Sequence, residues 1–153
     1  MSKWNDAAVW RSLVDGSACP VCIRGFPLEV IATLPSSWVT MPENAPMPGY
    51  ICLVSRVHVV ELHELDSLQA TSFMGDIQNV SRALSQATGA IKLNYEIHGN
   101  TLPHLHVHFY PRYAGDPFEN KVIEPRHVIQ PVYRPGQLQE IGNRMLEALK
   151  NPI

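Results

Sequence analysis

The chain of 153 residues has no long apolar run and little excess charge. No stretch approaches the ~20 consecutive apolar residues that a membrane-spanning helix needs. The start MSKWNDAAVW has no signal-peptide pattern. We therefore expect a cytoplasmic protein without a membrane partner. With 12 Lys and Arg against 14 Asp and Glu, the formal net charge is −2, which lacks the basic excess that binding to long nucleic acid requires. A short phosphate-bearing ligand needs only local donors and fits this charge.

The sequence also contains no internal repeat and no low-complexity tract. Its length fits one domain, and at 45% hydrophobic residues it can bury a core without covalent staples. We expect a single domain over residues 1–153.

Cysteine is scarce, with three residues in the chain. Cys19 and Cys22 form a Cys-x-x-Cys pair, which in a cytosolic protein indicates a metal site or a redox pair more than a structural disulfide. Cys52 lies in an apolar run and is expected to be a core residue.

Three histidines alternate with apolar residues in the stretch PHLHVHFYPR at 103–112. In an extended strand, successive side chains point to opposite faces. His104, His106 and His108 should therefore share one face, and the intervening apolar residues should be buried on the other, which fixes the register. Because proline lacks an amide donor, we expect this strand to end at Pro111.

A row of imidazoles supports two kinds of chemistry. Neutral imidazole is a metal ligand, and near pH 7 it is also a nucleophile or a proton donor. The alternative is an ordinary strand with three half-exposed histidines.

The other elements follow from periodicity and turn residues. Helices are expected over 5–15, from Asp66 or Ser67 to about Thr88, and over 137–150. Strands are expected over 28–34, 38–41, 50–55, 90–97 and 104–110. Residues 19–22 are expected to form a turn and residues 113–134 mainly an extended loop. The fold class is α+β: an antiparallel sheet of about five strands, covered on one face by the long helix, with additional N- and C-terminal helices.

The histidine pattern, followed by Pro-Arg, resembles the histidine triad (HIT) superfamily of nucleotide hydrolases and transferases. The resemblance extends over about residues 19–116, which would form the core of the domain, with the helix at 137–150 in a C-terminal extension. Residues 108–116 resemble the dinucleoside polyphosphate hydrolases of the superfamily. The landmarks in family order are Cys19-x-x-Cys22, Pro48-Gly49, Arg56-Val57-His58, the long helix, Asn94 and Gly99-Asn100-Thr101.

The resemblance implies nucleotidyl transfer to histidine followed by hydrolysis. His106 would attack the α-phosphate of a dinucleoside polyphosphate or a nucleoside phosphoramidate. Water would then resolve the covalent nucleotidyl-histidine. To present the correct tautomer, the other nitrogen of His106 should donate to a backbone carbonyl. His108 would contact the phosphate and the leaving group.

The resemblance also implies nucleotide-binding residues. Asn94, Asn100 and Thr101 match positions that bind ribose, phosphate or leaving group. The family usually has glutamine where this chain has Asn100, and histidine where it has Tyr50. The Tyr50 hydroxyl can hydrogen-bond phosphate, but it cannot supply an imidazolium at neutral pH.

The resemblance further assigns a metal set, comprising Cys19, Cys22, His58 and His104. Two thiolates and two imidazoles make a closed tetrahedral zinc site, which is structural. His104 would then be structural and His106 chemical. The alternative is that the two cysteines are free thiols or a redox pair.

Other residues and partners complete the expectations. His98 and His127 are expected to be surface residues outside the site. His63 is expected to be solvated or to form a local hydrogen bond. Arg112 is expected to be solvated, with phosphate contact as the alternative. The partner would be a small-molecule nucleotide, and the family usually forms a homodimer. Two other functions compete with nucleotide hydrolysis: a nucleotide-binding or scaffold protein with weak catalysis, and a metallohydrolase that uses the histidine row as metal ligands.

Overall fold

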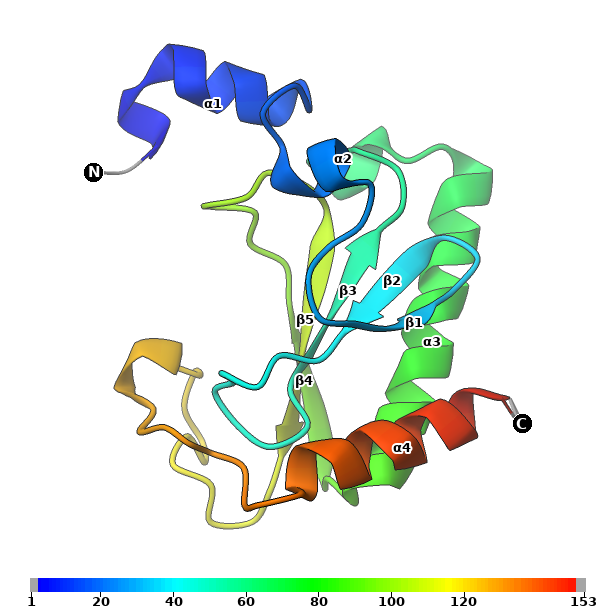
Figure 1. Cartoon of the computed structure of the whole chain (residues 1–153), viewed down its shortest axis with the longest axis vertical. Coiled ribbons are helices and arrows are strands. Elements are labelled where there is room, and N and C mark those ends of the chain that lie inside the picture. Colours follow the sequence, from blue (N-terminus) through cyan, green and yellow to red (C-terminus); the bar gives the residue numbers. More distant parts are fainter. Residues whose placement is uncertain (1–2, 151–153) are drawn as a thin grey trace.

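A computed structural model describes residues 3–150 and contains the predicted antiparallel sheet of five strands, in the order β1-β2-β3-β5-β4. The strands are β1 (Val30–Thr33), β2 (Ser37–Thr40), β3 (Ile51–Ser55), β4 (Lys92–Glu96) and β5 (His106–Arg112). The histidine strand β5 lies between β3 and β4, so both of its edges are paired (Figure 1). The predicted fold class is confirmed.

The helices lie close to their predicted positions. They are α1 (Ala7–Val14), α2 (Pro20–Arg24), α3 (Ser67–Thr88) and α4 (Gln137–Lys150), with short 3₁₀ turns at Lys3–Asn5, Leu62–Glu64 and Pro125–His127. One expectation was wrong. The Cys-x-x-Cys segment forms the short helix α2 and not only a turn, because Pro20 at its first position suits a helix start. The long helix α3 lies where it was predicted: it begins after Asp66, whose carboxylate accepts a hydrogen bond from the Gln69 amide, and it ends at Gly89, which has a φ of 65°. No helix within residues 3–150 meets the length and hydropathy that crossing a membrane requires.

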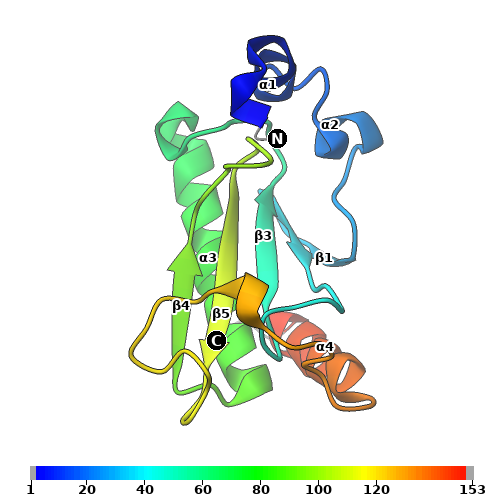
Figure 2. The same cartoon turned by 90° about the vertical axis from the view of Figure 1, so that its left-hand side faces the viewer.

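The main core lies between the sheet and the two long helices. Helix α3 covers one sheet face along its length, and α4 packs against α3 through Ile141 and Met145. Figure 2 views the opposite face, with α3 behind the sheet. From β5 and the residue before it, the core takes Leu105, Val107 and Phe109, all at most 2% exposed. The burial predicted from their alternation with histidine is confirmed.

Strand β5 differs from its prediction at both ends. It begins at His106, not His104, because the His104 amide donates to the carbonyl of Leu102 in a local turn. It also continues through Pro111 to Arg112. The Ser55 amide donates to the Leu105 carbonyl, so odd-numbered residues direct their backbone groups toward β3. Pairing with β3 stops at Phe109, and the missing Pro111 amide therefore costs no ladder bond.

The sheet face opposite α3 is partly covered at its two ends. Helices α1 and α2 lie beyond one end, and the segment that follows β5 crosses in front of the other (Figures 1 and 2). Residues of this segment, Phe118 and Ile123, bury a small cluster with Met47 and Tyr110, against which Tyr50 packs. The middle of this face remains open to the viewer in Figure 2.

A buried carboxylate ties α3 to the β1–β2 turn. Asp76 is 3% exposed. Its Oδ2 accepts hydrogen bonds from the Ser36 amide (3.0 Å), the Ser36 hydroxyl (2.7 Å) and the Ser37 hydroxyl (2.7 Å). These bonds fix the outer hairpin of the sheet to the helix behind it.

Asp76→Ala should lower the free energy of unfolding by about 2–4 kcal/mol, because it removes charge-assisted bonds and leaves buried hydroxyl donors unpaired. Denaturant unfolding measures this change. Asp66→Ala, which removes a helix cap worth about 1 kcal/mol, is the matched control. A loss for Asp76→Ala no larger than for the control would contradict this role.

Candidate functional site

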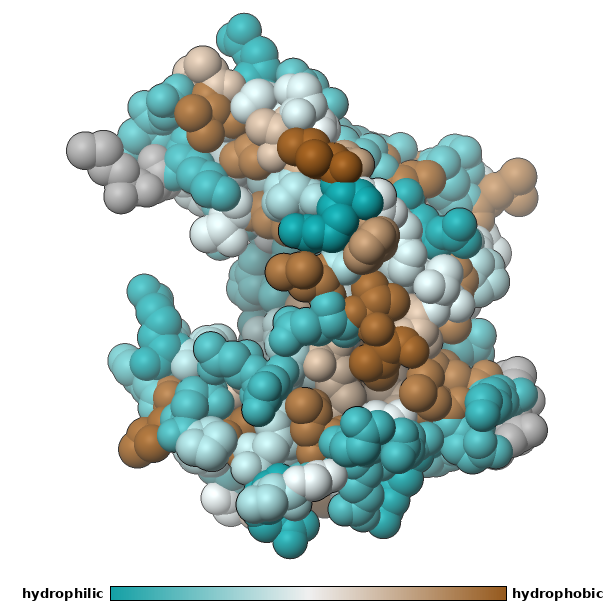
Figure 3. Space-filling view, in the orientation of Figure 1, coloured by the Kyte–Doolittle hydropathy of each residue, from teal (hydrophilic) through white to brown (hydrophobic). Residues whose placement is uncertain are grey.

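The open sheet face carries the side chains that alternate with the core. In an antiparallel pair, directly opposite residues share a face. Val54 pairs with His106, Cys52 with His108, and Glu96 with His108 from the other side. The polar groups of three strands thus meet on the face that α3 leaves uncovered. Figure 3 shows the surface hollowed between the N-terminal helices and the segment that follows β5.

His106 is held through one ring nitrogen. Its Nδ1 lies 2.6 Å from the backbone carbonyl oxygen of His104. Because a carbonyl only accepts, Nδ1 carries the proton and donates, and Nε2 keeps its lone pair. No hydrogen bond joins Nε2 to any residue between positions 3 and 150. The expected bond to a backbone carbonyl is therefore present, and the ring is half-buried with a free basic nitrogen.

His108 lies beside His106 and contacts β3. The two ring centroids are 4.7 Å apart. His108 Nδ1 lies 2.6 Å from the Tyr50 hydroxyl and 3.1 Å from Cys52 Sγ. Burial, followed by the charges of His106 and His98, lowers the pKa of His108 to about 4. His108 is therefore neutral at pH 7.

Two residues that lie near His108, Cys52 and His98, were not predicted to be part of the site. Cys52 was expected in the core, but its half-buried sulfur faces the site, and burial raises the pKa of its thiol to about 11. A nearly continuous apolar run gives no indication of which alternate residues face which side. His98 is exposed as expected, yet its ring lies 5.6 Å from that of His108, and its Nε2 lies 2.8 Å from the Glu96 carboxylate. His98 follows Glu96 by two residues, and Glu96 pairs with His108, so this spacing could have indicated that His98 lies near His108.

The four predicted metal ligands converge at one end of the sheet. Their ligand atoms all lie within 4.8 Å of one another. Cys19 and Cys22 come from the start of α2, His58 follows β3, and His104 precedes β5. Cys19 and His104 are buried, so the cluster ties the N-terminal arm to the ends of two central strands.

The histidines of this cluster are arranged to bind a cation. The Nε2 of His58 lies 2.8 Å from the Val14 carbonyl, and that of His104 lies 2.8 Å from the Ser55 carbonyl. Both Nε2 atoms therefore donate, and both Nδ1 atoms keep lone pairs. These two Nδ1 atoms are only 3.1 Å apart. The Cys19 sulfur lies 3.4 Å from His104 Nδ1, and the Cys22 sulfur lies 3.2 Å from His58 Nδ1. Burial lowers the pKa of His104, which favours the neutral ring that a metal ligand needs. The four residues fit a metal ion.

Arg112 organises the far end of the same face. It was expected to be solvated, but it forms a two-bond ion pair with Asp116 (2.8 Å for each bond) and donates to Asn94 Oδ1 at 2.6 Å. Its side chain is 12% exposed, and the guanidinium lowers the pKa of Asp116 to about 2. The contact between Asn94 and Arg112 could not be predicted from the sequence, because the two residues are 18 positions apart. Asn94 is left with its amide hydrogens to offer a ligand.

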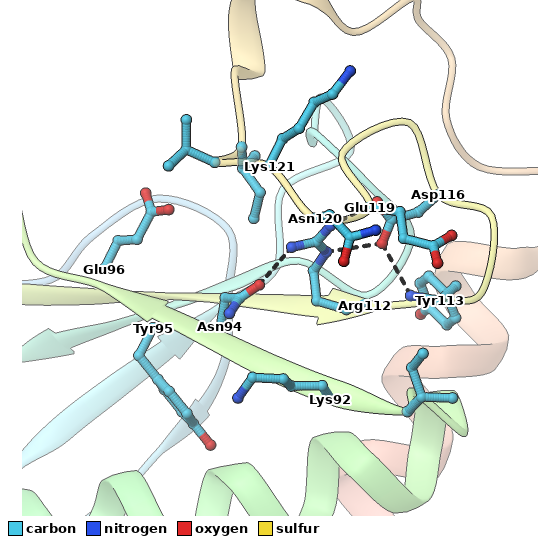
Figure 4. A pocket seen from close by; sticks show the side chains of 13 residues that line it. Lys92, Asn94, Tyr95, Glu96, Arg112, Tyr113, Asp116, Glu119, Asn120 and Lys121 are labelled. Atoms are coloured by element: carbon cyan, nitrogen blue, oxygen red, sulfur yellow. Dashed lines mark hydrogen bonds and ion pairs between the residues drawn. The ribbon is translucent and has the colours of Figure 1, made fainter.

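A pocket of about 620 Å³ lies beside Arg112 (Figure 4). It runs between β4 and the segment that follows β5, and neither His106 nor His108 lines it. The charges of Arg112 and Asp116 are paired within its wall. The two histidines thus lie outside this pocket, although Glu96, which pairs with His108, lines it.

The remaining predicted residues, Asn100 and Thr101, lie in the exposed connection between β4 and β5. The Thr101 carbonyl accepts a bond from Lys3 Nζ at 3.1 Å. Within residues 3–150, neither side chain forms a hydrogen bond. The structure thus brings together Tyr50, His106 and His108, and leaves Asn100 and Thr101 without a side-chain bond to them.

A family model and solved structures both relate this chain to histidine triad proteins. The HIT domain model matches residues 25–115. A histidine triad protein from Bradyrhizobium japonicum is 32% identical, with a TM-score of 0.68 over 78% of this chain and 89% of that chain. A Zn-bound histidine triad family protein from Mycobacterium smegmatis, 19% identical, has a TM-score of 0.65 over 88% of this chain and 94% of its own, which shows a shared fold.

A curated relative is more distant. The asymmetrical bis(5'-nucleosyl)-tetraphosphatase of Schizosaccharomyces pombe is 27% identical over 82 residues. That alignment covers 50% of this chain and 45% of the relative. The chain therefore spans less than half the length of this enzyme.

The ligand cluster predicts that the purified protein carries about one divalent metal ion per chain. Replacing both cysteines (Cys19→Ser with Cys22→Ser) should remove it, because the thiolates supply half of the ligands. Elemental analysis measures the metal content, and Cys52→Ser, whose sulfur lies outside the cluster, is the matched control. Full metal content in the double variant would contradict the ligand assignment.

Proposed function

The chain belongs to the HIT domain family, and from this premise we propose that it is a nucleotide hydrolase in which His106 is the nucleophile. The substrate would be a nucleoside phosphate derivative, a dinucleoside polyphosphate or a nucleoside phosphoramidate. The relation to a tetraphosphatase supports this class of reaction. The observation that carries the proposal is the 2.6 Å contact between His106 Nδ1 and the His104 carbonyl oxygen.

This contact supports nucleophilic attack for an electronic reason. With the proton fixed on Nδ1, the Nε2 lone pair is directed away from the backbone and is available for attack. Nε2 attacks the α-phosphorus and the leaving group departs with the electrons of the broken bond. A water molecule then hydrolyses the phosphorus–nitrogen bond and releases a nucleoside monophosphate. Neutral His108 donates a hydrogen bond to the phosphate or leaving group.

The surrounding polar groups would hold the nucleotide. Tyr50 is set beside His108, and Asn94 is oriented by Arg112, so both have a fixed geometry. Asn100 and Thr101 are exposed in the connection between β4 and β5, and would bind the ribose or phosphate of the ligand. Such oriented donors lower the energy of a charged transition state because they need no reorganisation.

We further propose that the metal is zinc. Two thiolates and two imidazoles suit zinc, and four protein ligands leave no open position for catalysis. The Zn-bound relative supports this assignment. When bound, the ion would supply structural cross-linking of Cys19, Cys22, His58 and His104, and no chemistry of the reaction.

The competing functions have less support. A metallohydrolase built on the histidine row would need His106 and His108 among the ligands. Within residues 3–150, the ligand cluster contains only His104 of the three. A nucleotide-binding scaffold with weak catalysis predicts tight binding without turnover, which the experiment below separates from hydrolysis.

A homodimer in the cytoplasm completes the proposal. Strand β4 is an edge of the sheet, and Ile91 and Ile97 are exposed beside its two ends. An unpaired edge with apolar flanks can pair with a second chain.

His106→Ala should abolish turnover, reducing kcat by about 10⁴-fold or more because the nucleophile is lost. Hydrolysis of diadenosine tetraphosphate and of adenosine phosphoramidate, followed by release of AMP, measures this effect. His127→Ala, which changes an exposed histidine in the segment after β5, is the control and should keep its activity. Undiminished activity in the His106 variant, with an unchanged circular dichroism spectrum, would reject the mechanism. Tight AMP binding without turnover by the unmodified protein would favour the scaffold.

A further inference from the structure

Three side chains from two strands form a closed triangle of short contacts behind the reacting histidines. Tyr50 immediately precedes β3, Cys52 lies within it, and His108 pairs with Cys52 from β5. The Tyr50 hydroxyl lies 2.6 Å from His108 Nδ1 and 3.0 Å from Cys52 Sγ. The distance from Cys52 Sγ to His108 Nδ1 is 3.1 Å. The hydroxyl and the thiol each bring one hydrogen to these three contacts, and the ring nitrogen can accept one of them.

The chemistry of these groups decides where the hydrogens lie. A phenol hydroxyl is a good donor and an imidazole nitrogen a strong acceptor, whereas sulfur is weak in both roles. The best arrangement has the Cys52 thiol donating to the Tyr50 oxygen and the Tyr50 hydroxyl donating to His108 Nδ1. Burial raises the pKa of Tyr50, so the hydroxyl keeps its proton. With Nδ1 accepting, the ring proton of His108 is on Nε2, the nitrogen that no described residue between 3 and 150 hydrogen-bonds.

We propose that Tyr50 is a positioning residue that holds His108 as a neutral ring with its proton on Nε2, and that the site therefore selects leaving groups that depart as phosphate oxyanions over those that depart as amines. This inference rests on the proposed function, and narrows its substrate class to phosphoric anhydrides such as dinucleoside polyphosphates.

The surroundings of His108 keep the ring neutral. The carboxylate of Glu96, the β4 residue that pairs with His108, lies 2.8 Å from His98 Nε2. Burial in this setting lowers the pKa of His108 to about 4, so an imidazolium is scarce at pH 7. The titratable groups that face the ring are Tyr50 just before β3, Cys52 on β3, His106 and Tyr110 on β5, Glu96 on β4, and His98 just after β4.

A neutral donor is sufficient for an anhydride. The His106 Nε2 lone pair forms the bond to the α-phosphorus, and the bond from that phosphorus to the bridging oxygen breaks. The electron pair stays on this oxygen, which leaves as part of a terminal phosphate. A phosphate oxyanion is stable without a proton at pH 7, so His108 Nε2–H needs only to donate a hydrogen bond.

A phosphoramidate makes a further demand. When its phosphorus–nitrogen bond breaks, the nitrogen must receive a proton, because an amide anion is far too basic to leave. If neutral His108 gave up its Nε2 proton, Nδ1 would have to take the proton of Tyr50, which would create a buried phenolate. The raised pKa of Tyr50 opposes that transfer. General acid catalysis is therefore lost for amines, a loss of about 10²-fold or more.

The test compares two probes at pH 7 with the full chain in its metal-loaded form. We expect kcat/KM for diadenosine tetraphosphate to exceed that for adenosine phosphoramidate by about 100-fold or more. Tyr50→His, which restores an ionisable ring, should raise the relative rate on the phosphoramidate at least about tenfold. Tyr50→Phe should lower the anhydride rate about tenfold, because it removes the donor to Nδ1. Tyr95→Phe, which deletes a hydroxyl that donates to Ser81 on α3, is the matched control and should leave both rates unchanged.

A second measurement reads the proton directly and needs no turnover. Two-bond ¹H–¹⁵N spectra of the imidazoles at pH 7, assigned with His108→Ala, should show His108 protonated on Nε2 and unprotonated on Nδ1. Tyr50→Phe should shift it toward the other tautomer. A wild-type ring protonated on Nδ1, or on both nitrogens, would overturn this inference while leaving His106 catalysis intact. Equal rates on both probes, or an unchanged preference in Tyr50→His, would also overturn it. Absence of turnover with both probes would refute the proposed function and the leaving-group preference together, whatever the tautomer.

Discussion

One residue, His104, joins the two halves of the candidate site. Its ring nitrogen Nδ1 faces Cys19, Cys22 and His58, and its backbone carbonyl accepts the proton of His106 Nδ1 at 2.6 Å. The ring is further fixed by its bond to the Ser55 carbonyl. A ligand cluster that holds this residue therefore also holds the acceptor that sets the tautomer of the proposed nucleophile. The ring of His104 would thus bind the metal, whereas its backbone carbonyl orients the proposed nucleophile, His106.

The sheet supplies the rest of the organisation through its period of two. Odd-numbered residues of β3 and β5 pack against α3, and even-numbered residues present Tyr50, Cys52, His106 and His108 on the opposite face. The site is rigid because the same backbone serves both faces, and a slip of one residue would move imidazoles into the core. Asp76 and Arg112 extend this rigidity outward, the first by fixing the β1–β2 turn to α3, the second by fixing the segment after β5 to β4.

Much of this arrangement could be predicted from the sequence, because hydrophobic periodicity and turn residues determined the strands and helices. The same alternation also predicted the buried face of β5 correctly. Most of the errors came from contacts that depend on strand register, which composition does not encode. These contacts are the orientation of Cys52, the bond from Arg112 to Asn94 and the approach of His98 to His108. The ion pair of Arg112 with Asp116 is local, four residues along the chain. Pro111 continues β5 because β3, which begins at Ile51 opposite Phe109, does not reach it. The single domain, the homodimer, the cytoplasmic location and the roles of all the site residues, Asn100 and Thr101 among them, stay predictions.

The central claim is that His106 Nε2 is free and directed at the phosphorus of a bound nucleotide. A crystal structure of the full chain with AMP tests it most directly. The account predicts that the α-phosphorus lies in front of Nε2 at about 3–3.5 Å, the separation of reacting atoms before attack, with His106 Nδ1 still bonded to the His104 carbonyl. A His106 ring bound to metal, or an AMP phosphate bound away from the histidine face, would contradict it.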